Sequence, residues 1–408
     1  MNTAATPQNA PEQERASLGV RIGRSSTPVV IMAFVFALLI SSVLILISND
    51  AVRQSAAYFF ARPGDFFRES WTAISSAYDA LFRGAVYDYH APTSTLRWYR
   101  LIDTLTVATP LIIAALGMAV GFRAGMFNIG GTGQLIIGAT AAGYVGFAFT
   151  LPPVVHLIAA LAAGVLGGAL WGGIAGFLKA RFGANEVITT IMLNFIAVNL
   201  LAWLLLTSAF RAPNVGTPQS PSVKANAVLP RLLGDEFRLH AGFIVMLLAA
   251  GFLWWLMNRS TLGFRFRAVG ENPRAAQVAG ISVGLTSFLV MVVAGSLVGL
   301  GGAVNVLGTE KFLNRDIAGS IGFDAITVAL LGRSGPVGII LAGILFAGLT
   351  TGGRYMEGVG VPIHLVSVIQ ALVVLFIAAP PLVRKWSGLS LLTRQRRSTT
   401  TATAAEEA

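Results

Sequence analysis

The sequence predicts an all-α fold, a polytopic membrane helix bundle of about ten transmembrane segments that include one short half-helix. Composition is the first observation behind this prediction: of the 408 residues, 55% are hydrophobic and 12% are charged, against about 25% charged in a soluble domain. The second observation is that the charges leave uncharged runs of about 20 residues, the length of a helix that crosses a bilayer. Together they nearly exclude a water-soluble enzyme.

The uncharged runs define the segments in order: 25–49, 104–122, 124–178, 187–210, 239–258, 275–309, 334–353 and 358–383. The run 124–178 is long enough for two helices, which Pro152 and Pro153 would separate by a turn. The apolar piece 325–332 is too short to cross and predicts half a helix, which is stable only where protein or water covers its ends. We expect the first run to be an uncleaved helix, because it is longer than the apolar region of a typical signal peptide.

The distribution of charge predicts that both termini are cytoplasmic. With the N-terminus inside and ten alternating segments, the inner side holds sixteen of the 29 basic and six of the 18 acidic residues. The net charge of +11 then divides into +10 inside and +1 outside, as the positive-inside rule requires. This distribution favours membrane topology over nucleic-acid binding as the reason for the excess. The domain prediction is a disordered cytoplasmic N-terminus (1–24), a transmembrane domain (25–386) and a cytoplasmic C-terminal tail (387–408).

The loops 50–100 and 211–238 fall on the outer side. Five apolar residues of the first loop recur at helical spacing: Phe67, Trp71, Ile74, Tyr78 and Leu81. This pattern predicts an amphipathic helix lying at the outer membrane interface, where aromatic rings are favoured. The alternative is a docking surface for an external partner. The second loop is rich in proline and is expected to be extended.

Glycines recur at every fourth position in three expected segments: Gly164, Gly168, Gly172 and Gly176, then Gly295 and Gly299, then Gly348 and Gly352. Small residues at this spacing let helix backbones approach closely in lipid. We expect close helix packing at these positions rather than a ligand site.

The chain lacks the residues that several kinds of catalytic and metal site require. The chain has no cysteine, which excludes disulfides, thiol catalysis and Cys-ligated metals. None of its four lysines follows a glycine, so the Walker A phosphate loop is absent. The four histidines are scattered in the sequence. We therefore expect no catalytic residue, no metal site and no cofactor.

One short motif resembles a protease signature. Residues 332–335 read Gly-Arg-Ser-Gly, the Gly-x-Ser-Gly pattern of intramembrane serine proteases, and His364 lies downstream. Arg333 would stand beside the nucleophile Ser334, however, and Pro336 follows at once. A turn between the half-helix and the next segment is the favoured interpretation, since a short motif outside its structural context is weak.

Uncharged polar residues are the candidates for a solute path. Five amides fall within the expected segments: Asn128, Gln134, Asn194, Asn199 and Asn305. Ion-coupled carriers place acids or histidines deep in the bundle, and this chain offers few. The pattern favours a neutral, hydrogen-bonding solute that is driven by something other than an ion. The alternative is that the amides only hold helices together.

Residues 259–281 form a cytoplasmic segment with the signals of a short capped helix. Asn272 is a good N-cap, Pro273 suits the first helical position and Gly280 suits the position after the last turn. Four arginines surround it: Arg259, Arg265, Arg267 and Arg274. A rigid capped helix of this kind is built to dock into a groove on a partner.

At these residues the sequence resembles the permease subunits of ATP-binding cassette (ABC) importers, in the branched-chain amino acid and simple-sugar permease superfamily. The segment GENPRAAQVAGI, from Gly270 to Ile281, is similar to the cytoplasmic helix that couples these permeases to their ATPase. Two further motifs are similar to the nucleoside subgroup: FNIGGTGQ (127–134) and NEVITTIMLN (185–194). Thr132 stands where the subgroup commonly has Glu. The resemblance extends from about Leu101 to Trp386.

The resemblance implies a multi-pass permease of the cytoplasmic membrane that moves nucleosides, with simple sugars or branched-chain amino acids as alternatives. An ion-coupled secondary transporter is a further alternative. The implied partners are cytoplasmic ATPase subunits, a second related permease or a second copy, and an external solute-binding protein or lipoprotein. ATP hydrolysis would then belong to the separate ATPase. The residues that the resemblance assigns to ATPase coupling are Gly270, Glu271, Asn272, Pro273, Arg274 and Ala275.

Overall fold

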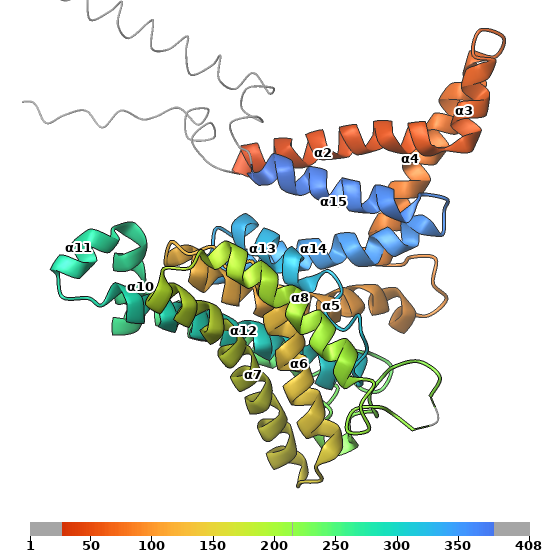
Figure 1. The fold of residues 1–408 in the computed structure, drawn as a ribbon. Coiled ribbons are helices and arrows are strands. Elements are labelled where there is room, and N and C mark those ends of the chain that lie inside the picture. Colours follow the sequence, from red (N-terminus) through yellow and green to blue (C-terminus); the bar gives the residue numbers. More distant parts are fainter. Residues whose placement is uncertain (1–26, 214, 379–408) are drawn as a thin grey trace, which may run out of the picture. The chain divides into compact units, whose positions relative to one another are not determined.

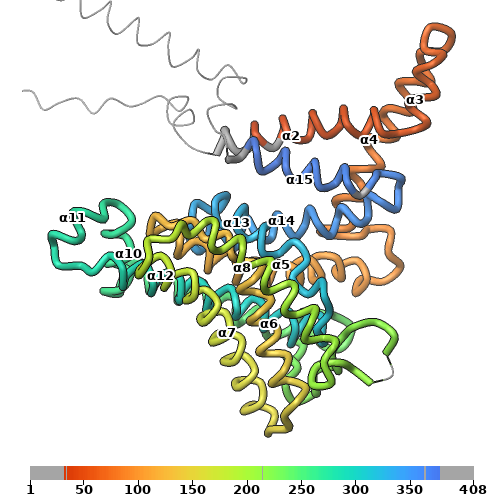
Figure 2. Tube along the Cα trace, in the orientation of Figure 1, coloured from red at the N-terminus to blue at the C-terminus, as the bar shows by residue number. Residues whose placement is uncertain are grey.

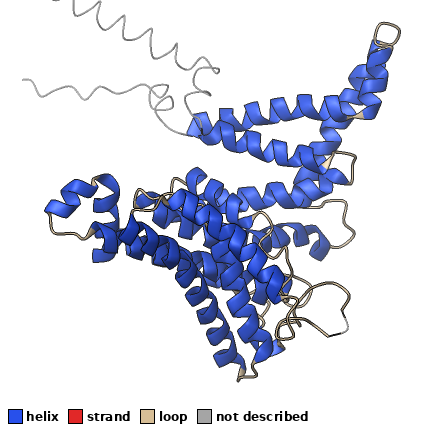
Figure 3. Ribbon diagram, viewed as in Figure 1, coloured by secondary structure: helices blue, strands red, loops and turns tan. Residues whose placement is uncertain are grey.

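The computed structural model describes residues 27–213 and 215–378. The two predicted tails, 1–24 and 387–408, lie outside the described residues. The chain divides into two compact units, one of residues 1–44 with 371–408 and the other of residues 45–370. In the first unit the rings of Phe36 and Phe376 pack with their centroids 6.1 Å apart. All regular elements of the described residues are helices (Figure 3).

The helices follow one another along the chain, and Figure 1 labels all of them except η1, α9 and η2: α2 (Thr27–Ser48), α3 (Asp50–Ala57), α4 (Pro63–Ala85), α5 (Ser94–Arg123), α6 (Gly131–Ala148), α7 (Pro153–Phe182), α8 (Glu186–Leu204), η1 (Ala225–Ala227), α9 (Gly242–Arg259), α10 (Thr261–Glu271), α11 (Pro273–Val278), α12 (Val283–Val304), η2 (Asn305–Glu310), α13 (Ile321–Leu331), α14 (Pro336–Glu357) and α15 (Ile363–Ala378). Each of the ten predicted segments contains a helix, and the turn at Pro152 and Pro153 separates α6 from α7 as expected.

The all-α membrane fold class is confirmed. Six described helices are long and apolar enough to cross a membrane: α5, α7, α8, α9, α12 with η2, and α14. A seventh is counted if residues 35–48 and α3, which meet at a bend of 71°, form one span. The helices α13 and α15 are apolar but shorter. The count of about ten spans therefore stays a prediction.

Helix α5 is the centre of the second unit. Its residues from Ala108 to Gly121 are buried on every side, and α9, α12, α13 and α14 pack around it. A helix that is apolar around its whole circumference belongs in the interior of a bundle. The following helix, α6, lies against α7 and α12.

The glycines of α7 and α12 pack against each other, which confirms the predicted close approach. A Cβ added to Gly168 would collide with the carbonyl oxygen of Gly295, and one added to Gly299 would collide with that of Gly164. In the third glycine pair only Gly352 makes such a close approach, since a Cβ there would collide with the Leu81 carbonyl oxygen of α4, whereas a Cβ at Gly348 would make only ordinary contacts. Backbones this close exclude any larger residue at the contact.

The predicted half-helix is α13, and it begins four residues earlier than the uncharged run indicated. The run began after Asp324, which lies in the first turn of α13. An acidic residue is favourable there because of the helix dipole, and the Ser320 hydroxyl donates a hydrogen bond of 2.6 Å to it. The N-terminal end of α13 meets α6, where Gly322 packs against Thr132. Protein therefore covers this end, as a half-helix requires.

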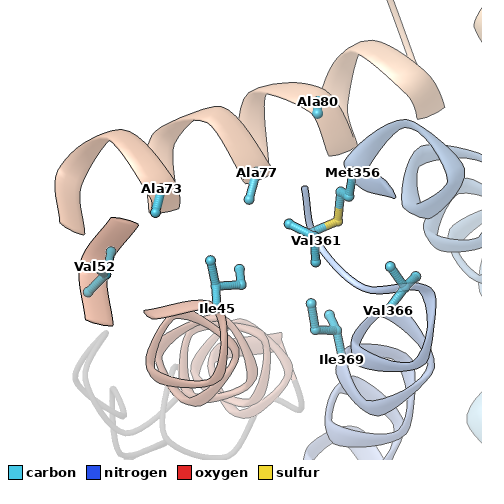
Figure 4. Packing of buried hydrophobic residues seen from close by; sticks show 9 residues of the cluster. All are labelled: Ile45, Val52, Ala73, Ala77, Ala80, Met356, Val361, Val366 and Ile369. Carbon is cyan, nitrogen blue, oxygen red and sulfur yellow. The ribbon is translucent and has the colours of Figure 1, made fainter. Parts of the chain in front are cut away.

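The loop 50–100 contains the predicted helix, α4, and the structure defines its buried face. Small residues line this face, and they pack with residues of α2, α3, α14, α15 and the turn before α15 in one apolar cluster (Figure 4): Ile45, Val52, Ala73, Ala77, Ala80, Met356, Val361, Val366 and Ile369. Of the predicted aromatic stripe, Phe67 and Trp71 are exposed, while Tyr78 and Leu81 are partly buried against the cluster. The exposed rings fit the predicted place at a membrane interface, which stays a prediction.

Within the second unit, α10 and α11 lie at one end and the long connection 205–241 lies at the other (Figure 2). We expected this connection to be extended; its described residues form turns, bends, irregular stretches and the 3-10 helix η1, and hydrogen bonds tie them to the chain around η2. Ser220 N–H donates to Leu313 O at 2.9 Å, and Val223 N–H donates to Lys311 O at 2.8 Å. One segment predicted to be cytoplasmic and one connection predicted to be external therefore lie at opposite ends of this unit.

Candidate solute-path and coupling sites

The linker 124–130 between α5 and α6 carries the first candidate amide. Asn128 faces Gln134 in the first turn of α6, and its Nδ2 donates to Gln134 Oε1 at 3.0 Å. In return, Gln134 Nε2 lies 3.3 Å from Asn128 Oδ1, which also accepts the N–H of Gly130 at 2.9 Å. The pair thus closes the linker onto the start of α6, where helix N–H groups would otherwise lack partners.

Asn194 ties the same linker to α8. Its Oδ1 accepts the N–H of Gly133 at 2.8 Å, and its Nδ2 donates to the carbonyl of Ile129 at 2.9 Å. Thr190, one turn earlier on α8, accepts the N–H of Ile129 at 3.3 Å. Two neighbouring helical turns of α8 therefore hold three backbone groups of the linker and of α6.

We call Asn128, Gln134 and Asn194 the amide cluster. All three are buried, with exposed fractions of 0%, 1% and 7%. Buried amides with hydrogen-bond partners hold helices together. The observed bonds therefore agree with the alternative in which these amides have only this structural role. Whether the amide cluster also borders the solute path stays a prediction.

The other two predicted amides lie elsewhere. Asn199 is exposed on α8 and donates to the carbonyl of Phe195 in its own helix at 2.8 Å. Asn305 is buried at the start of η2 and donates to the carbonyl of Ile317 at 2.8 Å. It joins the π-helical turn to the chain that leads into α13. The structure thus brings together three of the five predicted residues.

Sequence reasoning missed Trp171 of α7 beside the amide cluster. A Cβ at Gly133 would lie 2.8 Å from Trp171 Nε1 and 3.0 Å from Asn194 Oδ1. Trp171 Nε1 and Thr132 Oγ1 are buried without a hydrogen-bond partner among the described residues. Such polar atoms can bond water or a solute. The sequence signal that could have found it is a tryptophan, with its N–H donor, between Gly168 and Gly172 of the α7 glycine series.

The coupling segment, residues 259–281, is capped at every junction. Ser260 ends α9 and caps α10, where its Oγ accepts the Gly263 N–H at 2.9 Å. Asn272 ends α10 and caps α11, where its Oδ1 accepts the Ala275 N–H at 3.0 Å. Gly280 follows α11 with φ of +80°, the left-handed conformation that glycine adopts at no steric cost. The predicted caps are therefore confirmed.

The surface of α11 is open. Among its residues only Ala276 is buried, and Val278 is 91% exposed. Arg265, Arg267 and Arg274 form no ion pair with any described residue. The exposed surface of α11 carries Arg274 and the apolar Val278, with Arg265 and Arg267 on the preceding α10, and it is available to a partner with an acidic, apolar groove.

Ser334 lies in a turn, which agrees with the favoured interpretation of its motif. Arg333 and Ser334 have φ of 51° and 53°, and the Ser334 N–H donates to the Ala329 carbonyl at 2.8 Å. The two residues close the last turn of α13 before α14 begins at Pro336.

Comparison with known proteins identifies relatives over most of the chain. Residues 100–378 match the family described as branched-chain amino acid transport system, permease component. The guanosine ABC transporter permease protein NupP of Bacillus subtilis is 38% identical over 314 residues, covering 76% of this chain and 88% of that protein. The nucleoside ABC transporter permease protein NupB of Lactococcus lactis is 37% identical, over 68% of this chain and 78% of that protein.

A third relative has a different printed substrate. The glucose ABC transporter permease protein TsgB13 of Haloferax volcanii is 38% identical, over 68% of this chain and 76% of that protein. No solved structure matches the chain. Because the family match covers most of the chain and the relatives are permease subunits rather than enzymes, this multi-pass membrane protein belongs to the branched-chain amino acid transport system permease family of ABC transporters.

Proposed function

We propose that the chain is the permease subunit of an ATP-driven importer that moves nucleosides across the cytoplasmic membrane. The observation that carries the proposal is the similarity to guanosine and nucleoside permeases over two thirds or more of the chain. The motifs 127–134 and 185–194, which resemble the nucleoside subgroup, form the linker, the start of α6 and the start of α8. Their uncharged amides suit a neutral solute with many hydrogen-bonding groups.

The second candidate solute is a simple sugar. The observation that favours it is the glucose permease of Haloferax volcanii, which is as similar in identity as the guanosine permease. Sugars and nucleosides share hydroxyl groups, and nucleosides add an aromatic base. A single competition experiment separates them: uptake of labelled guanosine by the reconstituted transporter, with an excess of other nucleosides, glucose or leucine. Nucleosides should compete, and competition by glucose alone would favour the sugar.

The proposed partners are two cytoplasmic ATPase subunits, a second related permease and an external solute-binding protein. Two guanosine permease proteins of Bacillus subtilis are among the relatives, and this chain is 38% identical to NupP and 28% identical to NupQ. The same is true of the nucleoside permeases of Lactococcus lactis, at 37% and 27%. These pairs support a heterodimer in which this chain takes the place of the more similar partner.

The proposed orientation puts both termini and the coupling segment in the cytoplasm. The charge split of +10 against +1 supports it. So does the location of the arginine-rich α10 and α11 at the end of the second unit opposite the connection 205–241 (Figure 1). In this orientation α11 reaches the ATPase, and the external connection faces the solute-binding protein.

The proposed ATPase contact is tested by crosslinking on the natural cysteine-free chain. A cysteine at the exposed Ala275 of α11 should crosslink to a cysteine in the ATPase groove, whereas a cysteine at the exposed Thr217 should not. Ala275→Asp should abolish uptake and solute-stimulated ATP hydrolysis while the chain still inserts in the membrane. Transport that persists in Ala275→Asp, together with no crosslink from Ala275→Cys, would contradict the proposal.

Energy coupling is tested separately. Uptake should persist when proton and sodium gradients are collapsed and should stop when ATP is withdrawn. The opposite result would favour the ion-coupled transporter.

A further inference from the structure

The end of α10 touches the linker that follows α5, backbone against backbone. A Cβ at Gly270 would lie 2.7 Å from the carbonyl carbon of Ala124 and 2.9 Å from the carbonyl oxygen of Arg123. A Cβ at Gly125 would lie 2.9 Å from the carbonyl oxygen of Gly270. Gly125 also has φ of +67°, which side chains rarely permit. No side chain other than hydrogen fits at either position without a shift.

On one side of this contact, the helices of the coupling segment are joined by short, hydrogen-bonded connections. The junctions at Ser260 and Asn272 are single capped residues. A Cβ at Gly263 would collide with the Leu256 carbonyl oxygen, so α10 folds tightly against the end of α9. After α11, the N–H of Ile281 donates to the Ala276 carbonyl at 2.9 Å. These caps and close contacts leave few residues in the segment at which the chain could bend without breaking a bond.

On the other side of the contact the linker 124–130 is held just as firmly. The N–H of Met126 donates back to the Gly121 carbonyl of α5 at 2.9 Å. Two residues later Asn128 bonds to the start of α6, and Ile129 is held by Asn194 and Thr190 of α8. A shift at Gly125 must therefore move the amide cluster or break its bonds.

We propose that the contact between Gly270 and Gly125 is the point at which movement of the coupling segment passes to the linker, and that the amide cluster passes it on to α6 and α8. The inference rests on the proposed importer function. A packed backbone contact transmits a displacement because no flexible side chain absorbs it, and packed helices respond to such shifts by moving as rigid bodies. Gly270 is a positioning residue in this scheme and touches no solute.

The experiment is Gly270→Ala in the complete transporter, reconstituted in liposomes with its ATPase and binding protein. The readout is the amount of solute taken up per ATP hydrolysed, which a general loss of folded protein would not change. We expect this ratio to fall at least ten-fold, because the added methyl group separates α10 from the linker. The matched control is Gly251→Ala on the neighbouring α9, where a Cβ meets nothing within 4 Å, and its ratio should equal that of the wild type.

A wild-type ratio in Gly270→Ala overturns the inference. If this variant does not accumulate in the membrane, Thr190→Val tests the same inference at the contact between the linker and α8. It removes the acceptor of the Ile129 N–H with little change of volume, and the ratio should fall at least three-fold. An unchanged ratio in Thr190→Val would overturn the inference as well.

Failure of the proposed function gives a different result. If the wild-type chain does not take up solute on ATP and its Ala275→Cys variant forms no crosslink to the ATPase, the importer function is wrong. If the wild type takes up solute, the Ala275→Cys variant forms the crosslink and Gly270→Ala keeps the wild-type ratio, only the route through Gly125 is wrong. The comparison with Gly251→Ala is needed because a continuous chain of contacts between two sites does not by itself show that the sites are energetically coupled.

Discussion

His240 Nε2 lies 3.2 Å from Thr309 Oγ1, which joins the chain entering α9 to the π-helical turn η2. The other ring nitrogen, Nδ1, accepts the N–H of Gly242 at 3.2 Å. The ring is therefore neutral, with its proton on Nε2. Burial, followed by the charges of Arg238 and Lys311, lowers the pKa of His240 from 6.5 to about 4.

This lowered pKa predicts a loss of stability in mild acid. Between pH 6.5 and 4 the unfolded chain binds a proton at His240 that the folded chain does not bind, so stability falls as the pH falls. The stabilisation is complete above pH 6.5, and its loss amounts to at most about 3 kcal/mol at pH 4. Thermal unfolding in detergent should show a steeper decline from pH 7 to pH 5 for the wild type than for His240→Gln. His90→Gln, at an exposed position, should keep the wild-type slope. Equal slopes for all three proteins would show that His240 does not carry the effect.

Gly168→Ala should destabilise the protein through the contact of α7 with α12. The added Cβ would collide with the Gly295 carbonyl oxygen, and overpacking of this kind typically costs about 1–3 kcal/mol. The matched control on the same helix is Gly173→Ala, whose Cβ would have its nearest neighbour at 3.4 Å, an ordinary contact. The midpoint of thermal unfolding should fall for Gly168→Ala and stay near the wild type for Gly173→Ala. A similar midpoint for both variants would mean that the helices separate at little cost.

Asn194→Leu should be far more harmful than Asn199→Leu. The first change leaves the Gly133 N–H and the Ile129 carbonyl buried without their partner, at about 1–3 kcal/mol for each group. The second removes only a bond from an exposed side chain to its own helix. Thermal unfolding and solute uptake should both decline in Asn194→Leu, and both should be near normal in Asn199→Leu. Normal uptake in Asn194→Leu at normal expression would argue that the amide cluster neither borders the path nor transmits movement.

Single cysteines should report the orientation, because the natural chain has none to interfere. Ser220 is a poor probe of the external connection, since it is buried and its Oγ accepts the Leu313 N–H. Thr217 is exposed nearby, and Val278 is exposed on α11. A membrane-impermeant thiol reagent added to intact cells should label Thr217→Cys and not Val278→Cys, and inverted vesicles should give the opposite pattern. The reverse assignment would invert the proposed topology.

Local features were readable from the sequence. The caps of α11, the turn at Pro152 and Pro153, and the glycine ridge of α7 depend on residues within one or two helical turns of each other. Side-chain hydrogen bonds to the nearest backbone groups decide caps, and proline and glycine act through their own backbone geometry. The uncharged runs located each helix segment for the related reason that desolvation of charge is costly in a bilayer.

The tertiary structure decided how these elements meet. Spacing along the chain did not indicate that Asn194 would bond residues 61 and 65 positions away, or that Trp171 would face Gly133. It also misplaced the start of α13, because a count of charges cannot tell a carboxylate that stabilises a helix N-terminus from one that ends a span. The burial of the alanine face of α4, in place of its aromatic residues, depended on the small residues of α14 that it meets. A sequence states which faces are able to pack closely, and the partner that each face finds is fixed only when all helices compete for the same contacts.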